Sequence, residues 1–153
     1  SPALNALQRE AGGRLGVIGG VEVVRHYGDA AAEYQAIRSR AAAVVRSDLS
    51  QIRLWGRDPE RMLNGLITND LALLAEDRAV HGAIRSPKGR MIAEVRVVRR
   101  EDDLLVDVPT AALEAVSEHL RRYVPPLFAR WESLAERSGA IGVYGPAAGA
   151  VVE

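Results

Sequence analysis

The sequence predicts an α+β fold in which antiparallel strand meanders are interrupted by helices. Residues 78–108 contain three stretches of alternating apolar and polar side chains separated by two turn signals, which is typical of consecutive antiparallel strands. Asp29 and Asp58 each precede a stretch with helical character and fit the N-cap position. The order of these elements does not follow the regular strand–helix alternation of a doubly wound parallel sheet.

The composition excludes several classes of protein. The 153 residues include 20 Lys+Arg, 20 Asp+Glu and no cysteine. Zero net charge argues against direct nucleic-acid binding, and the lack of cysteine excludes disulfides, iron–sulfur or Cys–zinc sites and thiol catalysis within this chain. No apolar stretch approaches the ~18–20 residues that cross a membrane, and no signal pattern opens the chain, so we expect a cytoplasmic protein. His26, His81 and His119 lack metal-ligand spacing, so no metal site is expected.

The first part of the chain is expected to begin with a loosely structured lead-in. This lead-in covers residues 1–20 and is rich in glycine near its end. A short strand is predicted over Val21–Val24. An alanine-rich helix follows over Ala30–Ala43, with Asp29 as its N-cap.

A strand and a second helix are predicted next. Ile52 and Leu54 alternate with polar or amphipathic neighbours and indicate the strand. Asp58 caps the helix, and Pro59 occupies the first helical position, where its missing N–H costs nothing. The apolar stripe of this helix runs to Ile67, and the polar residues 68–70 end it.

Residues 78–108 are predicted to form a three-stranded meander. The strands cover Arg78–Ser86, Arg90–Arg100 and Leu104–Val108, and the bulged loop 87–89 joins the first two. Thr110 is the predicted N-cap of a third helix.

The last part of the chain is predicted to return to strands. Pro125-Pro126 stops the third helix, and strands follow over Arg130–Arg137 and Ala140–Tyr144. Gly145-Pro146 is then expected to open another helix.

Short segments follow one another in a fixed order along the chain: His26-Tyr27-Gly28-Asp29, Glu33-Tyr34, Ala36-Ile37-Arg38, Asp48-Leu49-Ser50, Trp55-Gly56-Arg57-Asp58 with Leu63, Leu66-Ile67-Thr68-Asn69-Asp70, Ser86-Pro87-Lys88-Gly89 and Val143-Tyr144-Gly145-Pro146-Ala147. Together they resemble the superfamily of the glycine-cleavage T-protein (aminomethyltransferase) and its folate-binding YgfZ-type relatives. Each segment alone is a weak signal, whereas their order and spacing over nearly the whole chain are specific.

The resemblance implies a protein that binds tetrahydrofolate or its 5,10-methylene or 5-methyl derivative. In the T-protein, tetrahydrofolate accepts a methylene carbon from an aminomethyl group on a lipoyl-carrier protein, and ammonia is released. In the YgfZ-type branch, folate binding is tied to the maturation of iron–sulfur enzymes, and a cysteine motif lies further along the chain. The match covers the N-terminal portion of the family's usual length. We therefore expect residues 21–153 to be the N-terminal part of a folate-binding domain, cut at its C-terminal end and completed by a missing half or a second chain.

The resemblance also places a catalytic acid on this sequence. The T-protein carries the acid in a Gly-Gly-x-x-Asp-Asp stretch, which aligns with residues 89–94 here. The second glycine is Arg90, the first acid is Ala93, and the second acid, at the functional position, is Glu94. A carboxylate at this position would hold the pterin or the reacting nitrogen. These departures favour the YgfZ-type branch.

The residues around Glu94 leave two interpretations open. Glu94 is either a solvated carboxylate beside Arg96 or a ligand-binding group. A bulged loop that pairs Ser86 with the residue after the loop places Gly82 opposite Glu94, which would leave open space for a ligand. A register one residue tighter would instead place His81 opposite Glu94 as a carboxylate partner, although an ordinary strand histidine is the simpler interpretation.

Three further residues are candidates for folate binding. Ile52 occupies a position where the T-protein has a ligand-lining apolar residue, although strand core is the better interpretation. Tyr27 either packs against the ligand or closes a loop on the core. Val98 is expected on the same face of its strand as Glu94.

The sequence is consistent with three functions. The first is a folate-binding accessory protein of iron–sulfur enzyme maturation, and the second is a folate-dependent aminomethyltransferase that uses Glu94. The third is a structural half-domain without activity of its own. The expected partners are folate and either a lipoyl-carrier protein or iron–sulfur enzymes, without a membrane.

Overall fold

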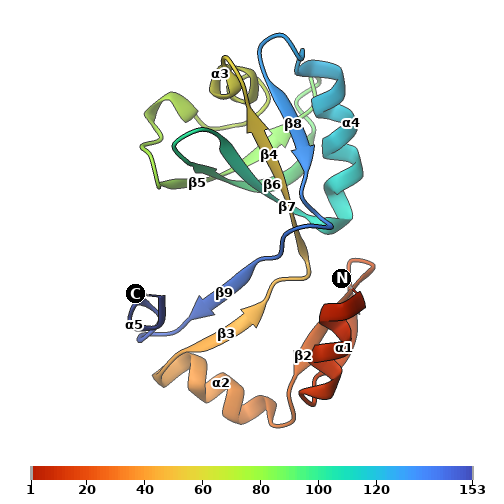
Figure 1. Cartoon of the computed structure of the whole chain (residues 1–153), viewed down its shortest axis with the longest axis vertical. Helices are drawn as coiled ribbons and strands as arrows, with labels where there is room; N and C mark the ends of the chain where they lie inside the picture. Colours follow the sequence, from red (N-terminus) through yellow and green to blue (C-terminus); the bar gives the residue numbers. More distant parts are fainter. Residues whose placement is uncertain (1, 153) are drawn as a thin grey trace. The chain divides into compact units, whose positions relative to one another are not determined.

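The computed structural model describes residues 2–152 and, from residue 6 onward, their side chains (Figure 1). The chain divides into two compact units. The sheet unit is the continuous segment Leu49–Ser138, and the split unit consists of Ser1–Asp48 and Gly139–Glu153.

The sheet unit is built on a five-stranded antiparallel sheet with the order β5-β6-β7-β4-β8. The strands are β4 (Leu49–Trp55), β5 (Ala79–Arg85), β6 (Met91–Arg99), β7 (Leu104–Pro109) and β8 (Arg130–Ser133). Consecutive strands β5, β6 and β7 form the meander that the alternating pattern predicts. Strand β4 lies between β7 and β8, which places an early strand beside a late one.

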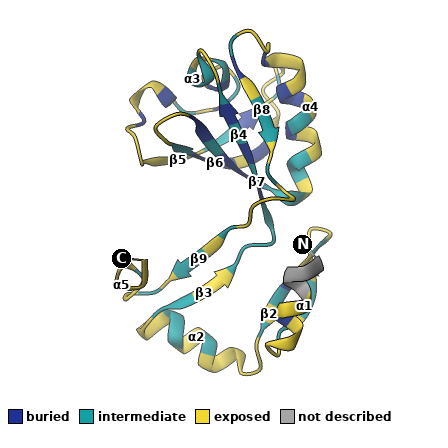
Figure 2. Ribbon diagram, viewed as in Figure 1, coloured by how far each residue is buried: buried dark blue, intermediate teal, exposed yellow. Residues whose placement is uncertain are grey.

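One face of this sheet is covered and carries the core. The covering elements are α3 (Pro59–Asn64), the 3₁₀ helices η1 (Leu71–Leu73) and η2 (Thr110–Ala112), and α4 (Leu113–Tyr123). Ile52 and Leu54 of β4, Leu63 of α3 and Val116 of α4 are fully buried in one cluster, which is dark blue in Figure 2. We call the opposite face of the sheet the outward face.

The split unit contains two separate two-stranded sheets. Its elements are α1 (Pro2–Glu10), β1 (Arg14–Ile18), β2 (Val21–His26), α2 (Ala30–Ser39), β3 (Ala42–Val45), β9 (Ile141–Tyr144) and α5 (Gly149–Val152). Strand β1 pairs with β2, and β3 pairs with β9 from the far end of the chain. Among its described side chains only Gln8 and Val23 are buried.

The predicted fold class and the predicted N-caps Asp29 and Asp58 are confirmed. The structure is a mixture of antiparallel sheets and a few helices. Asp29 accepts hydrogen bonds from the backbone N–H groups of Ala31 and Ala32, each at 3.0 Å, and so caps α2. Asp58 caps α3 in the same way through the N–H of Arg61 at 3.3 Å.

Three local predictions are wrong. The lead-in is not loosely structured, because its described residues form α1 and β1. Helix α2 ends at Ser39 rather than Ala43, because residues 42–45 pair with β9 and this pairing outweighs the helix propensity of alanine. Thr110 does not cap α4; its Oγ1 lies 3.0 Å from Ser50 Oγ, and a turn of 3₁₀ helix precedes α4.

Within residues 2–152, every helix is too short or too polar to cross a membrane.

Candidate functional site on the outward face of the sheet

Strand β6 places Glu94 on the outward face. Ala93, Val95 and Val97 are buried on the core face, whereas Glu94 and Arg96 between them are exposed. This is the period-two alternation of a strand that is covered on one side only. Val98 continues the outward series and is half-buried, so the predicted common face of Glu94 and Val98 is confirmed.

The predicted registers between β5 and β6 are both wrong. The loop pairs as expected, since Ser86 N–H donates to the Arg90 carbonyl at 2.8 Å. A bulge then shifts the pairing between Ile84 and Arg85, and Glu94 faces Ala83 instead of Gly82 or His81. The bulge adds one residue on β6, so every cross-strand pair beyond it is shifted by one position.

Gly82 also has a different role from the one predicted. It pairs with Val95 on the core side, where a Cβ atom would approach Asn69 Oδ1 to 2.5 Å and Ile67 to 3.0 Å. The glycine therefore allows close packing of the segment around Ile67 and Asn69. It does not open space in front of Glu94.

Four polar side chains form a row across the outward face beside Glu94. His81 of β5 is opposite Arg96 of β6, Arg96 is opposite Asp107 of β7, and Asp107 is opposite Gln51 of β4. Asp107 is buried although it lies on this face, and it accepts hydrogen bonds from Gln51 Nε2 at 3.0 Å and Arg96 Nη1 at 3.5 Å. We call these four residues the polar row.

Three of the five predicted site residues lie on this face. Glu94, His81 and Val98 lie on adjacent strands β5 and β6, with His81 diagonal to Glu94. Within residues 2–152, neither Glu94 nor His81 makes a side-chain hydrogen bond or ion pair. Their polar atoms are therefore available to a ligand.

The other two predicted residues lie elsewhere. Ile52 is 0% exposed and packs in the core on the opposite face of the same sheet. Tyr27 belongs to the split unit, where its backbone N–H donates to Glu33 Oε1 at 2.7 Å and its side chain is exposed.

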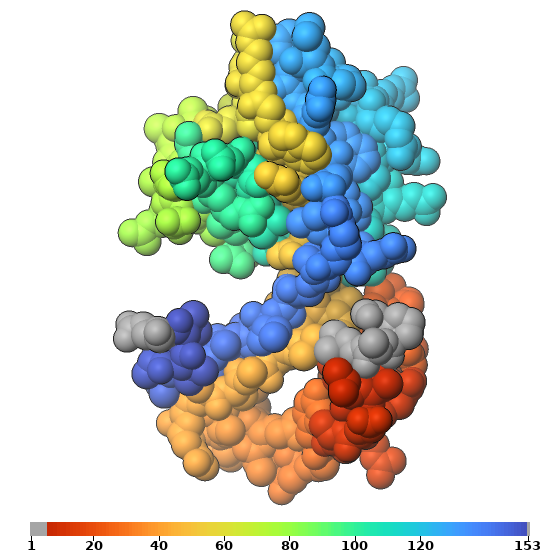
Figure 3. All heavy atoms as spheres, in the orientation of Figure 1, coloured from red at the N-terminus to blue at the C-terminus, as the bar shows by residue number. Residues whose placement is uncertain are grey.

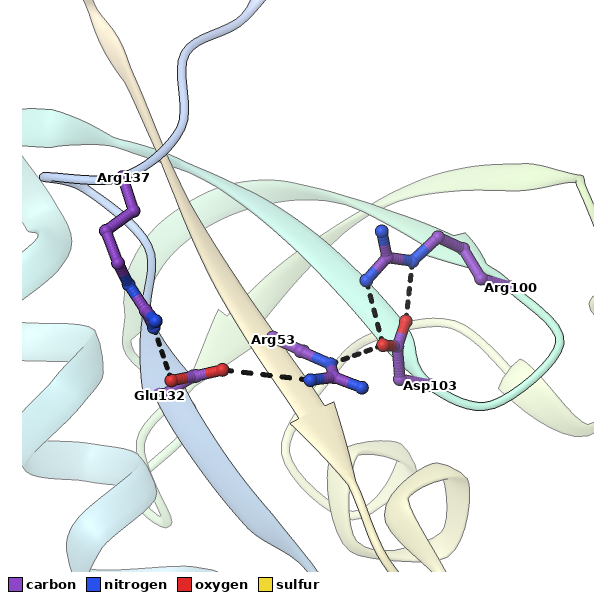
Figure 4. A network of polar contacts seen from close by, with 5 residues as sticks. All are labelled: Arg53, Arg100, Asp103, Glu132 and Arg137. Carbon is purple, nitrogen blue, oxygen red and sulfur yellow. Dashed lines mark hydrogen bonds and ion pairs between the residues drawn. The ribbon is translucent and has the colours of Figure 1, made fainter.

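A second polar cluster lies at the end of the outward face where β6 turns into β7 (Figure 4). Arg53 of β4 contacts the carboxylates of both Asp103 and Glu132, and the two outer arginines each contact one of them. We call this set the carboxylate–arginine network. It consists of Arg53, Arg100, Asp103, Glu132 and Arg137.

Asp103 is the centre of this network. Its side chain is 6% exposed, and Arg100 binds it through two bonds, Nε–Oδ1 at 2.6 Å and Nη2–Oδ2 at 2.8 Å. Burial raises the pKa of Asp103, but the hydrogen bonds from Arg100 and Arg53 outweigh it and hold the pKa below its usual value. Asp103 is therefore ionised at neutral pH.

An open pocket of ≈ 530 Å³ lies over this network. Its lining includes Arg53, Arg100, Asp103, Glu132 and Arg137, and does not include Glu94. Because the described carboxylates and arginines of the network already satisfy one another, we assign the network a structural role.

Sequence reasoning missed the polar row, although a signal was present. Asp107 is a single charged residue between Val106 and Val108 in an otherwise apolar strand. A buried strand tolerates such a residue only where its charge is paired. Gln51 could be identified from its place in the alternation of β4, but the register that brings it to Asp107 could not.

Comparison with known proteins identifies the family. The model of the GCVT N-terminal domain matches residues 4–153. An aminomethyltransferase from Rubrobacter xylanophilus is 31% identical over 140 residues, which cover 92% of this chain and 38% of that protein. An aminomethyltransferase from Acidobacterium capsulatum is 25% identical over 147 residues, covering 95% of this chain and 39% of that protein.

A solved structure shows the same fold. The crystal structure of the glycine cleavage system aminomethyltransferase T from Bartonella henselae superposes with a TM-score of 0.87 at 18% identity, over 97% of this chain and 41% of that one. The chain thus spans about two fifths of the length of the relatives it matches. Because the family model covers nearly the whole chain, the chain belongs to the family of the GCVT N-terminal domain.

Proposed function

We propose that this chain is part of a tetrahydrofolate-dependent aminomethyltransferase and that its outward face contributes to the folate site. The observation that carries the proposal is Glu94: a carboxylate that is exposed, without a partner among the described residues, and placed where the family resemblance expects an acid. The relatives from R. xylanophilus and A. capsulatum are named aminomethyltransferases, which supports transfer over a role in iron–sulfur enzyme maturation.

The outward face fits a reduced pterin in its chemistry. An ionised carboxylate only accepts hydrogen bonds, and the amino and ring N–H groups of a reduced pterin only donate them. Beside Glu94, the small side chain of Ala83 leaves an apolar surface for a ring, whereas Val98 lies four residues along β6, beyond Arg96. His81 and the polar row border this surface on one side.

Glu94 has one role in the proposed reaction. Bound tetrahydrofolate supplies the nitrogen nucleophile that accepts the one-carbon unit. The carboxylate of Glu94 accepts a hydrogen bond from an N–H at the reacting centre and stabilises the positive charge that develops there. The guanidinium of Arg96, on the same face, turns its Nη1 toward Asp107 at 3.5 Å and forms no ion pair with Glu94 among the described residues.

The loss of the first acid of the family motif does not weaken this proposal. Ala93 is only 5% exposed and points into the core, because adjacent residues of a strand face opposite sides. A carboxylate at that position would not share the outward face with Glu94. The departure at Ala93 therefore leaves the outward face unchanged.

Folate titration tests the proposal directly. In calorimetric titration with tetrahydrofolate we expect Glu94→Ala to weaken binding by about 10-fold or more, since a hydrogen bond to a charged group contributes about 1.5–3 kcal/mol. Glu136→Ala is the matched control, because Glu136 is an exposed glutamate of the same unit that lies outside strands β5 and β6. Absence of binding by the unsubstituted chain would favour the third function, a half-domain without activity of its own.

Transfer activity separates binding from chemistry. In a full-length protein that carries this chain, Glu94→Gln is expected to lower aminomethyl transfer from a lipoyl carrier by about 100-fold or more while affinity for folate falls less. Glu94→Asp tests whether the longer side chain matters to the geometry. Unchanged transfer by Glu94→Gln would refute the assigned role.

A further inference from the structure

We infer that Arg96 is a second ligand-binding group of the outward face, which donates a hydrogen bond to the C4 carbonyl oxygen of a reduced pterin and makes the site selective for 4-oxo pterins. The inference rests on the proposed function, because it concerns the ligand assigned to Glu94. Arg96 follows Glu94 by two residues on β6, so both lie on the outward face. The stretch that the family resemblance aligns, residues 89–94, ends before Arg96.

The guanidinium of Arg96 is only partly used within the protein. Its Nη1 lies 3.5 Å from Asp107 Oδ2, and this is the one polar contact of the side chain among the described residues. The side chain is 49% exposed. A guanidinium carries five N–H donors in a fixed plane. The Nε and Nη2 groups of Arg96 are therefore available to a ligand.

The carboxylate–arginine network shows the contrasting case. Arg100 binds Asp103 through both Nε and Nη2, at 2.6 and 2.8 Å. Asp107 is about as buried as Asp103, yet Arg96 meets it with a single nitrogen at a longer distance. A bidentate pair uses the planar edge with which an arginine recognises a second group, and Arg96 keeps that edge.

The polar row holds Arg96 in place beside Glu94. The side chain of Asp107 is 9% exposed, and its Oδ1 accepts a hydrogen bond from Gln51 Nε2 at 3.0 Å while its Oδ2 faces Arg96. A buried carboxylate is costly unless it is paired, so Asp107 and Arg96 depend on each other. Figure 3 shows atoms of the segment around β5 and β6, coloured from light green to teal, at the surface of the sheet unit. Asp107 is thus a positioning residue for a guanidinium that remains open to a ligand.

The pair of Glu94 and Arg96 matches one edge of a reduced pterin. On this edge the N5–H, which donates, lies beside the C4 carbonyl oxygen, which accepts. Glu94 accepts from the first group and Arg96 donates to the second. Alternate residues of a strand are about 7 Å apart, a separation that these two long side chains can close over one ligand. A 4-amino group would instead place two donors against each other, which a carboxylate alone would not penalise.

Calorimetric titration with two pterins tests the inference. The sample is a full-length protein that carries this chain, and the probes are tetrahydrofolate and its 4-amino analogue. We expect tetrahydrofolate to bind about 10-fold or more tightly than the analogue, and Arg96→Met to abolish this preference by weakening tetrahydrofolate binding. Arg121→Met is the matched control, because Arg121 is an exposed arginine of α4, which covers the opposite face of the sheet.

Two further variants separate recognition from folding. Arg96→Met leaves the buried Asp107 without its cation, so the double variant Arg96→Met/Asp107→Asn removes both charges and serves as the sample if the single variant does not fold. It too is expected to lose the preference. Asp107→Asn alone is expected to lower the preference less, because Arg96 remains but loses its charged anchor. An unchanged preference in Asp107→Asn would overturn the positioning role of Asp107.

The inference and the proposed function fail in different ways. If Glu94→Ala weakens tetrahydrofolate binding while Arg96→Met and the double variant keep the preference, the role of Arg96 is overturned and the proposed function stands. Equal affinities of the unsubstituted protein for the two compounds would also overturn the role of Arg96. Binding of neither compound would overturn both. Loss of the preference in Arg121→Met would show that the preference does not arise at Arg96.

Discussion

The two units of this chain differ in how far they bury their apolar side chains. In the sheet unit, β6 buries every second side chain and leaves the others to carry charge, so one covering layer of helices completes it. In the split unit, β3 and β9 bury no side chain, although nearly all of their side chains are apolar. An alternating strand needs one cover, and an apolar strand needs two.

This difference assigns different roles to the two units. The apolar residues of the sheet unit already form one continuous core, and its outward face is free to present polar groups. The split unit has apolar surface left over. We therefore expect stability to reside in the sheet unit and association to reside in the split unit.

The largest expected effect comes from removing core volume in the sheet unit. Leu54 is 0% exposed, and Leu54→Ala is expected to cost about 2–5 kcal/mol because it removes buried apolar surface and leaves a cavity. Urea unfolding followed by tryptophan fluorescence measures this, since both tryptophans, Trp55 and Trp131, belong to this unit.

The matched substitution lies in the split unit. Ile18 is 62% exposed on β1, and Ile18→Ala is expected to change the free energy of unfolding by less than about 0.5 kcal/mol. Equal losses for Ile18→Ala and Leu54→Ala would contradict the assignment of stability to the sheet unit.

The difference between the units also explains which elements the sequence could predict. The meander was predictable because burial of one face only makes apolar and polar side chains alternate with a period of two along β6 and its neighbours. Strand β3 was not, because Ala42–Val45 has no alternation and its alanines favour a helix. Its partner β9 lies almost a hundred residues later, and β3 is a strand only because it pairs with that distant segment.

The candidate site was predictable in part for a related reason. The face on which Glu94 lies follows from the alternation, and so does the presence of Val98 on that face. The residue opposite Glu94 depends on a bulge, which adds one residue without a composition signal of its own. Asp107 lies in the polar row because of the register between β6 and β7, which a single sequence does not specify.

An intermediate effect is expected from the carboxylate–arginine network. Asp103→Ala removes a nearly buried carboxylate and leaves Arg53 and Arg100 without their shared partner, although both arginines remain partly exposed. We expect a cost of about 1–2 kcal/mol at neutral pH in the same urea experiment.

The pH dependence of this effect has a definite sign. Because the folded pKa of Asp103 lies below its unfolded value of 3.8, the stabilisation is present above pH 3.8 and is lost as the pH falls through the folded pKa. In the split unit, Glu22→Ala alters a pair with Arg9 in which both side chains are about half exposed, and it is expected to cost less. A larger cost for Glu22→Ala than for Asp103→Ala would reverse the comparison.

The smallest expected effect is a pH dependence from His119 of α4. His119 is 8% exposed, its Nε2 has no partner among the described residues, and its ring lies 4.7 Å from the Tyr123 ring in a tilted arrangement. Burial lowers the pKa of His119 and outweighs the hydrogen bond with the backbone of Arg85, and the charge of Arg122 lowers it further.

The folded chain therefore binds this proton less readily than the unfolded chain, whose histidine titrates at 6.5. Stability is unaffected above pH 6.5 and falls as the pH drops from 6.5 to the folded pKa. Thermal unfolding of His119→Leu between about pH 7 and pH 5 is expected to lack this fall, whereas His26→Leu in the split unit retains it. Because the fluorescence of Trp55 and Trp131 reports on the sheet unit, retention of the fall in His119→Leu would locate its cause at another titrating group.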